Sequence, residues 1–274
     1  MPGADLLAVG MVSGWGEGLG ALPGDASDAC AGQASLMVER PQLDGERFRR
    51  ATRECLIGVA AVRALLAASG RTARDISGGA TALLYVTAAA YGASNRAFVE
   101  AAPPAGTLHF PYTAPSAVPS EVAIEFQVTG PYVIFVGGAT ATIEALAHAA
   151  RLIERGECEQ ALVLAVETFR ECEDLHARAR WLLDRPLVET GACALLGRGS
   201  GRLRVVDATE RSELAGRARR RAGETLACEP LIGLALGLES GDDSLHVTGE
   251  WRGRRLGLEW ALPHRASSTN GAQV

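Results

Sequence analysis

The sequence predicts a layered α/β fold, in which a mostly parallel sheet carries helices on both of its faces. Apolar, strand-like runs alternate with longer amphipathic segments through roughly the first 170 residues. Glycine is abundant, at 32 of 274 residues, which suits tight turns and close approaches between backbones. The chain is also 47% hydrophobic, so it can bury the core that such a fold needs.

The elements of the first part follow from the periodicity of apolar residues. Short runs rich in leucine, β-branched and aromatic residues predict buried strands at 5–12, 81–88, 131–136 and 160–167. Apolar residues at helical spacing predict helices at 45–69, 94–102, 116–127 and 139–155, the first three flanked by Gly70, Pro103 and a capping Ser116. Between the first strand and the first helix, residues 13–33 form a loop rich in Gly, Ala and Asp.

The pattern changes after about residue 170. A charged helix is expected at 174–184, and a second helix at 225–239. Residues 187–196 and 202–208 are predicted to pair as strands around a Gly-Arg-Gly-Ser-Gly turn, and two last strands flank a turn at Gly253. Residues 265–274 are polar and are expected to form a disordered tail.

Composition excludes several classes of function. The net charge of −5 predicts no general attraction to nucleic acid or to a membrane surface. All 27 basic residues are arginine, so a Schiff-base lysine and a P-loop lysine are both ruled out. The six cysteines are scattered without a Cys-x-x-Cys pair, which predicts neither a metal site nor a disulfide framework. No cofactor motif, signal peptide or membrane-spanning run is found, and a cytoplasmic location is expected.

The most informative segment is a strand, a two-glycine turn and a helix with no nucleophile at the turn. The strand ends at Val136, Gly137 and Gly138 form the turn, and the helix begins at once. A turn of this kind lifts its tip residue out of the sheet and onto a helix N-terminus, where a thiolate or an oxyanion is stabilised. The tip residue is Ala139, whose methyl group cannot attack a substrate.

Two longer stretches around this turn resemble the β-ketoacyl synthases. FPYTAPSAVPSEVAIEFQVTGP is similar to the segment that passes the synthase active-site mouth, and ATIEALAHAARLIERGECEQALVLAVET to the nucleophile helix and the next strand. The resemblance is best over residues 110–168. It implies a thiolase-like layered sandwich over 1–264, with a complete N-terminal half (1–170) and a truncated C-terminal half (171–264).

The same resemblance implies that the catalytic residues are missing. The nucleophilic cysteine of the family aligns with Ala139, and the second catalytic histidine aligns with Glu224. The block that carries the first histidine has no counterpart, since the resemblance implies a chain shortened between about 209 and 222. Condensation needs a thiolate to hold the acyl chain and two imidazoles to assist decarboxylation. No catalytic residue is therefore predicted in this chain.

A synthase-like chain without these groups resembles the chain-length factors of type II polyketide synthases. The resemblance implies a heterodimer with an active ketosynthase, an acyl carrier protein that brings substrate, and a role in polyketide, polyene or fatty-acid-like synthesis. It implies that the strand before the turn pairs with the partner, and that 86–98 helps set the depth of the acyl tunnel. The residues implied at the dimer interface are Tyr132, Val133, Ile134, Phe135 and Val136, and those implied at the tunnel are Tyr91, Asn95 and Phe98.

Two alternatives remain open: an acyltransferase or decarboxylase with altered chemistry, and a homodimeric acyl-binding protein. Thr140 and Thr142 are expected to cap and pack the helix rather than to act as nucleophiles. Cys193 and Cys228 are expected to be buried. Of the five histidines, His109 and His148 remain candidates for a functional role, whereas His176, His246 and His264 are expected at the surface. Arg217, Arg219, Arg220 and Arg221 are expected to form a solvated helix face or a surface for an acidic carrier protein.

Overall fold

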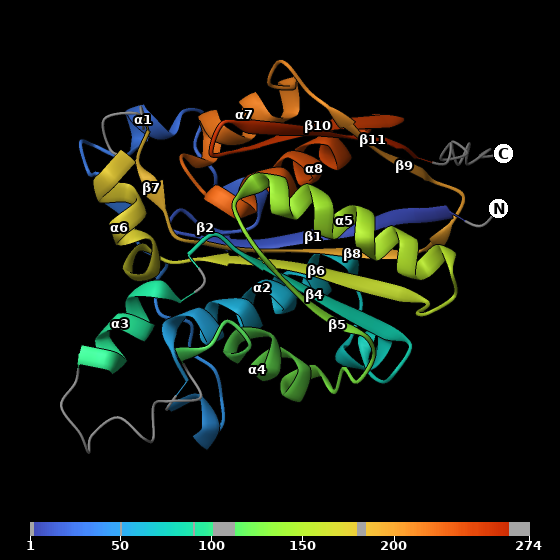
Figure 1. Cartoon of the computed structure of the whole chain (residues 1–274), viewed down its shortest axis with the longest axis horizontal. Helices are drawn as coiled ribbons and strands as arrows, with labels where there is room; N and C mark the ends of the chain where they lie inside the picture. Colours follow the sequence, from blue (N-terminus) through green and yellow to red (C-terminus); the bar gives the residue numbers. More distant parts are fainter. Residues whose placement is uncertain (1–2, 50, 90, 101–112, 180–184, 263–274) are drawn as a thin grey trace, which may run out of the picture.

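The computed structural model describes residues 3–49, 51–89, 91–100, 113–179 and 185–262 and contains two main sheets (Figure 1). The first sheet has six strands. In spatial order these are β2 (Gly16–Glu17), β1 (Gly3–Ser13), β8 (Thr190–Gly199), β6 (Gln160–Glu167), β4 (Thr81–Thr87) and β5 (Tyr132–Val136). β4 is parallel to both β5 and β6, whereas β8 is antiparallel to β6 and β1. β2 is also antiparallel to β1, so three of the five strand pairings are antiparallel, and the sheet is mixed rather than mostly parallel as predicted.

The second sheet has three antiparallel strands that come from the last part of the chain. In spatial order these are β10 (Ser244–Trp251), β11 (Arg254–Ala261) and β9 (Arg202–Asp207). A short parallel ladder joins β3 (Ser35–Leu36) to β7 (Leu187–Val188). The contrast between six strands and three agrees with a complete first half and a shortened second half.

Helices form layers around these sheets (Figure 1). α2 (Arg53–Ser69) and α4 (Ala117–Phe126) cover one face of the six-stranded sheet. α5 (Ala139–Glu154) and α8 (Glu229–Ser240) lie between the two sheets, and α7 (Glu213–Ala222) packs against α8. The remaining helical segments are α1 (Ala26–Ala29), α3 (Gly92–Glu100), α6 (Phe169–Ala179), and the short 3-10 turns Leu19–Ala21, Glu46–Arg49, Ala73–Ile76 and Leu226–Cys228.

Two hydrophobic cores lie on the two faces of the six-stranded sheet. Successive residues of a strand point to opposite faces, so Leu83 joins the core under α2 while Leu84 joins the core around α5. All seven residues of β4 are buried, which explains why its sequence is a continuous apolar run rather than an alternating one. The core around α5 continues into the inner face of the second sheet, including Val247, Leu258 and Trp260.

The outer face of the second sheet is polar. His246 and Glu259 lie opposite each other on β10 and β11, and Arg204 of β9 lies opposite Glu259. The Arg204 Nη2 atom is 2.6 Å from a carboxylate oxygen of Glu259. Because these side chains alternate with the buried ones, the second sheet shows the pattern of a sheet that is solvated on one side.

The predicted pairing of 187–196 with 202–208 is wrong. β8 lies between β1 and β6, so both of its edges are occupied and β9 is left to pair with β11. The glycine-rich segment between them crosses from one sheet to the other. Asp5 holds this crossover, since its carboxylate accepts hydrogen bonds from the backbone N–H groups of Ser200 and Gly201.

Several helix predictions need correction at their ends. The segment 45–69 is divided, because Thr52 caps a new helix: its hydroxyl accepts from the backbone N–H of Cys55. Gly70 ends this helix in the left-handed conformation, as its glycine predicts. Ser116 makes no side-chain capping bond. The helix expected at 174–184 begins earlier, at Phe169, and the expected tail at 265–274 lies outside the described residues.

Candidate functional site

The strand-turn-helix segment has the geometry that its sequence predicts. β5 ends at Val136, and α5 begins at Ala139 after the two glycines. Gly138 has no room for a side chain, because a Cβ atom there would lie 2.2 Å from the indole ring of Trp251. The tip of the β10–β11 hairpin therefore packs directly on the turn. No side chain caps the N-terminus of α5, so the capping role expected for the threonines is wrong.

Ala139 borders a cavity of about 560 Å³. Its walls come from the start of α5, from α6, from the loop before α8 and from the β10–β11 hairpin. The residues that line it are Ala139, Cys172, Leu175, His176, Leu187, Arg211, Arg219, Glu224, Leu226, Glu229, Glu250, Trp251, Arg252 and Gly253. The sequence predicted Ala139 and Glu224 at matching positions of one site, and the structure brings both to this cavity.

Charged side chains form part of the cavity wall. Arg219 of α7 lies 2.7 Å from the carboxylate of Glu224, whose side chain also accepts the backbone N–H of Leu226. Arg211 lies 3.7 Å from Glu250. Glu224 is 5% exposed, and such a buried carboxylate needs this guanidinium because an unpaired charge would be costly there.

Glu229 is a second buried carboxyl group in the same wall. Its residue is 5% exposed, and the Arg219 guanidinium approaches it only to 4.0 Å. Burial raises the pKa of Glu229 to about 8, with a further contribution from the neighbouring negative charge of Glu224. The positive charges of Arg211 and Arg219 oppose this shift without reversing it. The raised pKa favours the protonated form of this carboxyl group, which can donate a hydrogen bond.

α6 contributes a thiol and an imidazole. The Cys172 thiol donates a hydrogen bond to Glu167, with 3.2 Å between sulfur and oxygen, and burial raises the pKa of this thiol. A thiol with a raised pKa is a poor nucleophile. His176 borders the cavity and packs its ring edge-on against Phe169 at 6.2 Å between centroids. His176 is half-buried, so it lies at the surface as predicted while also bordering the cavity.

The other candidate residues lie away from the reacting position. Burial raises the pKa of both Cys193 and Cys228, so neither thiol is activated. The Thr142 hydroxyl donates to the backbone carbonyl of Ala227 at 2.6 Å, which is a packing role. His148 packs on Phe135 with 5.9 Å between ring centroids. His246 is exposed, and His109 and His264 lie outside the described residues.

The arginines of α7 do not form a single basic face. Arg219 turns towards Glu224, while the Arg221 guanidinium donates to the backbone carbonyls of Leu19, Leu22 and Pro23. Arg217 donates to the Ser240 hydroxyl. The helix has an apolar side that packs on α8, so its arginines are distributed around the remaining directions. The uniform solvated or docking face expected from the sequence is therefore not present.

The residues expected at the tunnel lie on α3 and just before it. Tyr91 is buried in the core beneath α2, Asn95 donates from its amide to the carbonyl of Thr113 at 2.9 Å, and Phe98 is half-buried. None of the three lines the cavity at Ala139. Their role in setting tunnel depth stays a prediction.

β5 is an edge strand of the six-stranded sheet. Its neighbour is β4 on one side, and the described residues place no strand on the other. The Leu83 N–H bonds to the carbonyl of Pro131, and the Gly137 N–H bonds to that of Thr87. Since such bonds alternate along a strand, the backbone groups of Tyr132, Ile134 and Val136 point away from the sheet.

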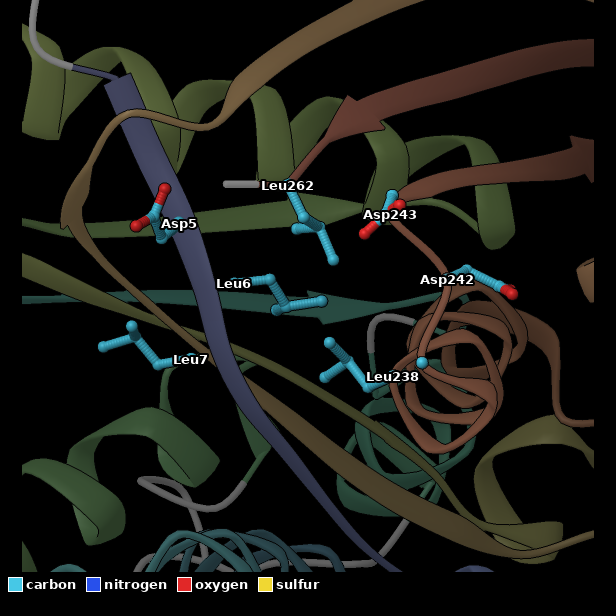
Figure 2. A pocket seen from close by; sticks show the side chains of 8 residues that line it. Asp5, Leu6, Leu7, Leu238, Asp242, Asp243 and Leu262 are labelled. Atoms are coloured by element: carbon cyan, nitrogen blue, oxygen red, sulfur yellow. The ribbon is translucent and has the colours of Figure 1, made fainter. Parts of the chain in front are cut away.

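A second cavity, of about 210 Å³, lies at the other end of α8 (Figure 2). Leu6, Leu238 and Leu262 form its apolar part, and Asp5, Asp242 and Asp243 lie around it. The Asp5 carboxylate is already bonded to the crossover amides described above.

No helix in the described part of the chain is both long and apolar enough to span a membrane.

Comparison with known proteins agrees with this fold. The model of the β-ketoacyl synthase N-terminal domain matches residues 33–193, more than half of the chain. The chain therefore belongs to the β-ketoacyl synthase family. No curated protein matches it.

Solved structures with a similar fold include a ketosynthase/chain length factor and complexes that contain a ketosynthase. The ishigamide ketosynthase/chain length factor superposes with a TM-score of 0.66 at 18% identity, covering 95% of this chain and 99% of that one. A type II polyketide synthase acyl-carrier protein in complex with its ketosynthase (AntDE:AntF) superposes with a TM-score of 0.74 at 12% identity. The match covers 96% of this chain and 100% of that one. The ketosynthase ApeO in complex with its chain length factor ApeC, from Xenorhabdus doucetiae, superposes with a TM-score of 0.60 at 14% identity. The match covers 94% of this chain and 99% of that one. At these identities the likeness shows the thiolase-like fold.

Sequence reasoning missed three residues of the site. Glu229, Trp251 and His176 come from α8, from the hairpin and from α6, and only the fold brings them together. The sequence held one signal for Glu229. This glutamate begins an otherwise apolar helix, and glutamate is unusual at a position that becomes buried.

Proposed function

We propose that this chain is a non-catalytic, ketosynthase-like subunit of chain-length-factor type. It forms a heterodimer with an active ketosynthase that supplies the cysteine and both histidines. The observation that carries the proposal is the methyl group of Ala139 at the start of α5, in a cavity where Glu224 pairs with Arg219. A methyl group and an ion-paired carboxylate cannot form an acyl thioester or assist a decarboxylation.

The exposed edge of β5 is the proposed pairing surface of this heterodimer. Tyr132 is 45% exposed and Val136 is 60% exposed, and Ile124 on the neighbouring α4 is 61% exposed. An apolar edge strand with outward backbone groups is a site of strand addition or of aggregation. A partner strand along Tyr132–Val136 satisfies these groups and extends the sheet into a second subunit.

The proposed role of the subunit is to support the partner and to shape its acyl tunnel. Tyr91, Asn95 and Phe98 remain the candidates for setting chain length, because α3 projects from the end of the sheet at which β4 and β5 terminate (Figure 1). An acyl carrier protein delivers the growing polyketide, polyene or fatty-acid-like chain to the ketosynthase. The heterodimer is expected to act in the cytoplasm and to need no cofactor of its own.

Co-expression with a ketosynthase that carries an intact cysteine and two histidines tests the proposal. We expect the two chains to co-purify and to extend a carrier-bound acyl chain only together. Val136→Lys places a charge on the exposed edge and should abolish co-purification, whereas His246→Lys on the outer face of the second sheet should not. Condensation or decarboxylation by this chain alone, or a stable homodimer that ignores the ketosynthase, would overturn it in favour of the two alternatives above.

A further inference from the structure

α3 is attached to the rest of the molecule in an unusual way. All 9 of its residues are described, and none of them is buried. A helix of a folded protein is normally stabilised by an apolar face that packs on a core, and an isolated helix this short is at best marginal in water. α3 therefore depends on particular polar contacts to stay helical.

A carboxylate from another helix caps α3. The backbone N–H groups of Ala93 and Ser94 lie 3.0 and 3.1 Å from the side-chain oxygens of Glu171, which belongs to α6. The Ser94 hydroxyl donates to the same carboxylate. The first N–H groups of a helix have no intrahelical partner, and a negative charge beside them is favourable. Glu171 is 6% exposed, so these charge-assisted hydrogen bonds are shielded from water.

The residue just before α3, Tyr91, forms a strained joint. Its ring is buried in the core beneath α2, while its backbone φ angle is +60°. A positive φ is unfavourable for a residue with a large side chain. Its carbonyl accepts the first bond of the helix, from the Asn95 N–H at 2.9 Å. Opening of α3 breaks this bond and relieves the strain at the joint, while the ring can stay in the core.

Two further polar contacts hold α3. Arg96 forms an ion pair with Asp174 of α6, and both side chains are largely exposed, at 53% and 43%. The Asn95 amide donates to the carbonyl of Thr113 at 2.9 Å. An exposed ion pair contributes little to stability, whereas several bonds to one buried carboxylate contribute more. Glu171 therefore makes the strongest of these contacts.

α6 has this contact on one side and the wall of the cavity at Ala139 on the other. Glu171 and Asp174, three residues apart, reach α3, whereas Cys172, Leu175 and His176 line the cavity. α3 lies beside α6 at the periphery of the molecule (Figure 1). The position of α6 thus sets both the cavity wall and the closed position of α3.

We propose that α3 is a hinged arm that opens about Tyr91 as one unit while both sheets stay folded, and that the Glu171 carboxylate holds the arm closed. The arm is a property of this chain alone, so a failure to find it and a failure to form the heterodimer are separate outcomes. Asn95 and Phe98 are also proposed tunnel residues, so the arm makes the tunnel depth adjustable; this one consequence rests on the proposed function.

Amide hydrogen exchange of the purified full chain, resolved by residue with NMR, tests the arm. We expect the amides of residues 95–99 to exchange through one common opening, faster than those of β4 and β6. Glu171→Ala should raise this opening rate about 10- to 100-fold, the effect of losing hydrogen bonds to a charged group, and should leave β4 and β6 unchanged.

Three variants serve as comparisons. Glu173→Ala, at an exposed position of α6, is the matched control and should change nothing. Arg96→Ala removes only the exposed ion pair, so it should raise the rate by at most about fivefold. Gly92→Ala should slow exchange by about two- to fivefold, because its Cβ meets open space and alanine restricts the opened chain. Thermal unfolding checks that each variant is folded, and the last two test the arm even if Glu171→Ala is not.

Each other outcome overturns the inference. Faster exchange at Ala93 and Ser94 alone would show fraying of the first turn rather than an arm. A parallel rise in β4 and β6 would show that Glu171 supports the whole fold. An unchanged rate in Glu171→Ala, or exchange that Gly92→Ala does not slow, would show that α3 does not open as a helix held by this carboxylate.

Discussion

The two sheets of this protein differ in how many faces they bury. In the six-stranded sheet, Leu162 and Val163 are adjacent on β6, point to opposite faces, and are both fully buried in different cores. In the three-stranded sheet, Val247 is fully buried while the adjacent His246 is exposed. The first sheet is an inner layer, whereas the second is an outer layer with a solvated side.

This difference shows how the second sheet ends the stack of layers with a polar face. A fragment cut from a larger layered fold would expose an apolar sheet face. Here the outward positions of β9, β10 and β11 carry groups such as Arg204, His246 and Glu259 instead. The sequence of these strands is therefore adapted to end the stack of layers, and the most exposed large apolar side chains lie elsewhere, at Val136 on β5, Ile124 on α4 and Val99 on α3.

The largest expected effect comes from placing a charge on each side of each sheet. Leu162→Lys and Val163→Lys should both prevent folding, because each buries an unpaired ammonium, at a cost of more than about 4 kcal/mol. On the second sheet, Val247→Lys should do the same while His246→Lys should stay within about 0.5 kcal/mol of wild type. Chemical denaturation measures the free energy of unfolding of each variant. Equal tolerance of both lysines on β6 would contradict the inner-layer assignment.

Buried and exposed carboxyl groups of the two sheets should respond to pH in opposite ways. Burial raises the pKa of Glu167, at the end of β6, from 4.5 to about 8, whereas the ion pair with Arg204 lowers the pKa of Glu259. Above pH 4.5 the unfolded chain loses the Glu167 proton that the folded chain keeps, so this group makes stability fall as pH rises towards 8. Glu259 contributes stability above its unfolded pKa and loses it in acid.

Glu167→Gln should remove this decline. We expect the variant to gain stability relative to wild type between pH 5 and pH 8, on the order of a few kcal/mol at the upper end. Glu259→Gln should show no such gain over that range. Denaturation curves at several pH values measure both, and a wild-type stability that does not fall faster than that of Glu167→Gln would contradict the buried, protonated state.

An intermediate effect is expected where the β10–β11 hairpin contacts the turn before α5. Gly138→Ala would place a Cβ atom 2.2 Å from the Trp251 ring, so the hairpin must shift, at a cost of about 1–3 kcal/mol. Ala139→Ser is the neighbouring control, because its hydroxyl can enter the cavity. A lower melting temperature for Gly138→Ala alone would support the contact, and an unchanged one would place the hairpin away from the turn.

The smallest effect is expected on the outer face of the second sheet. Arg204→Ala removes the ion pair with Glu259, and both side chains are largely exposed, at 72% and 44%. Exposed pairs contribute little, so stability should change by less than about 1 kcal/mol. A larger loss in thermal unfolding would indicate that this face is covered in solution, contrary to its description as the outer layer.

Local patterns predicted much of the fold. The apolar runs at 81–88 and 160–167 became β4 and β6, and the last hairpin formed around Gly253 as expected. Strand partners were harder, because nothing local in 187–208 shows that β8 inserts between β1 and β6. Pairing depends on strands that are distant in the sequence, and a glycine-rich turn is compatible with both a hairpin and a crossover.

The candidate site was only half predictable for the same reason. Ala139 and Glu224 followed from the family pattern, since each occupies a position that the pattern defines. Glu229 could not be assigned, because its state depends on Arg219 being used by Glu224. Trp251 could not be placed on Gly138 from sequence either, since more than 100 residues separate them.

The position of the last hairpin has a consequence for biosynthesis. β10 and β11 cover α5 and pack on the turn at Gly138, yet they are the last strands in the described part of the chain. Until the ribosome has made them, the side of α5 and α8 that faces away from the six-stranded sheet lacks its cover. We therefore expect the growing polypeptide to depend on chaperones late in translation, and a premature stop codon before the hairpin to produce insoluble protein.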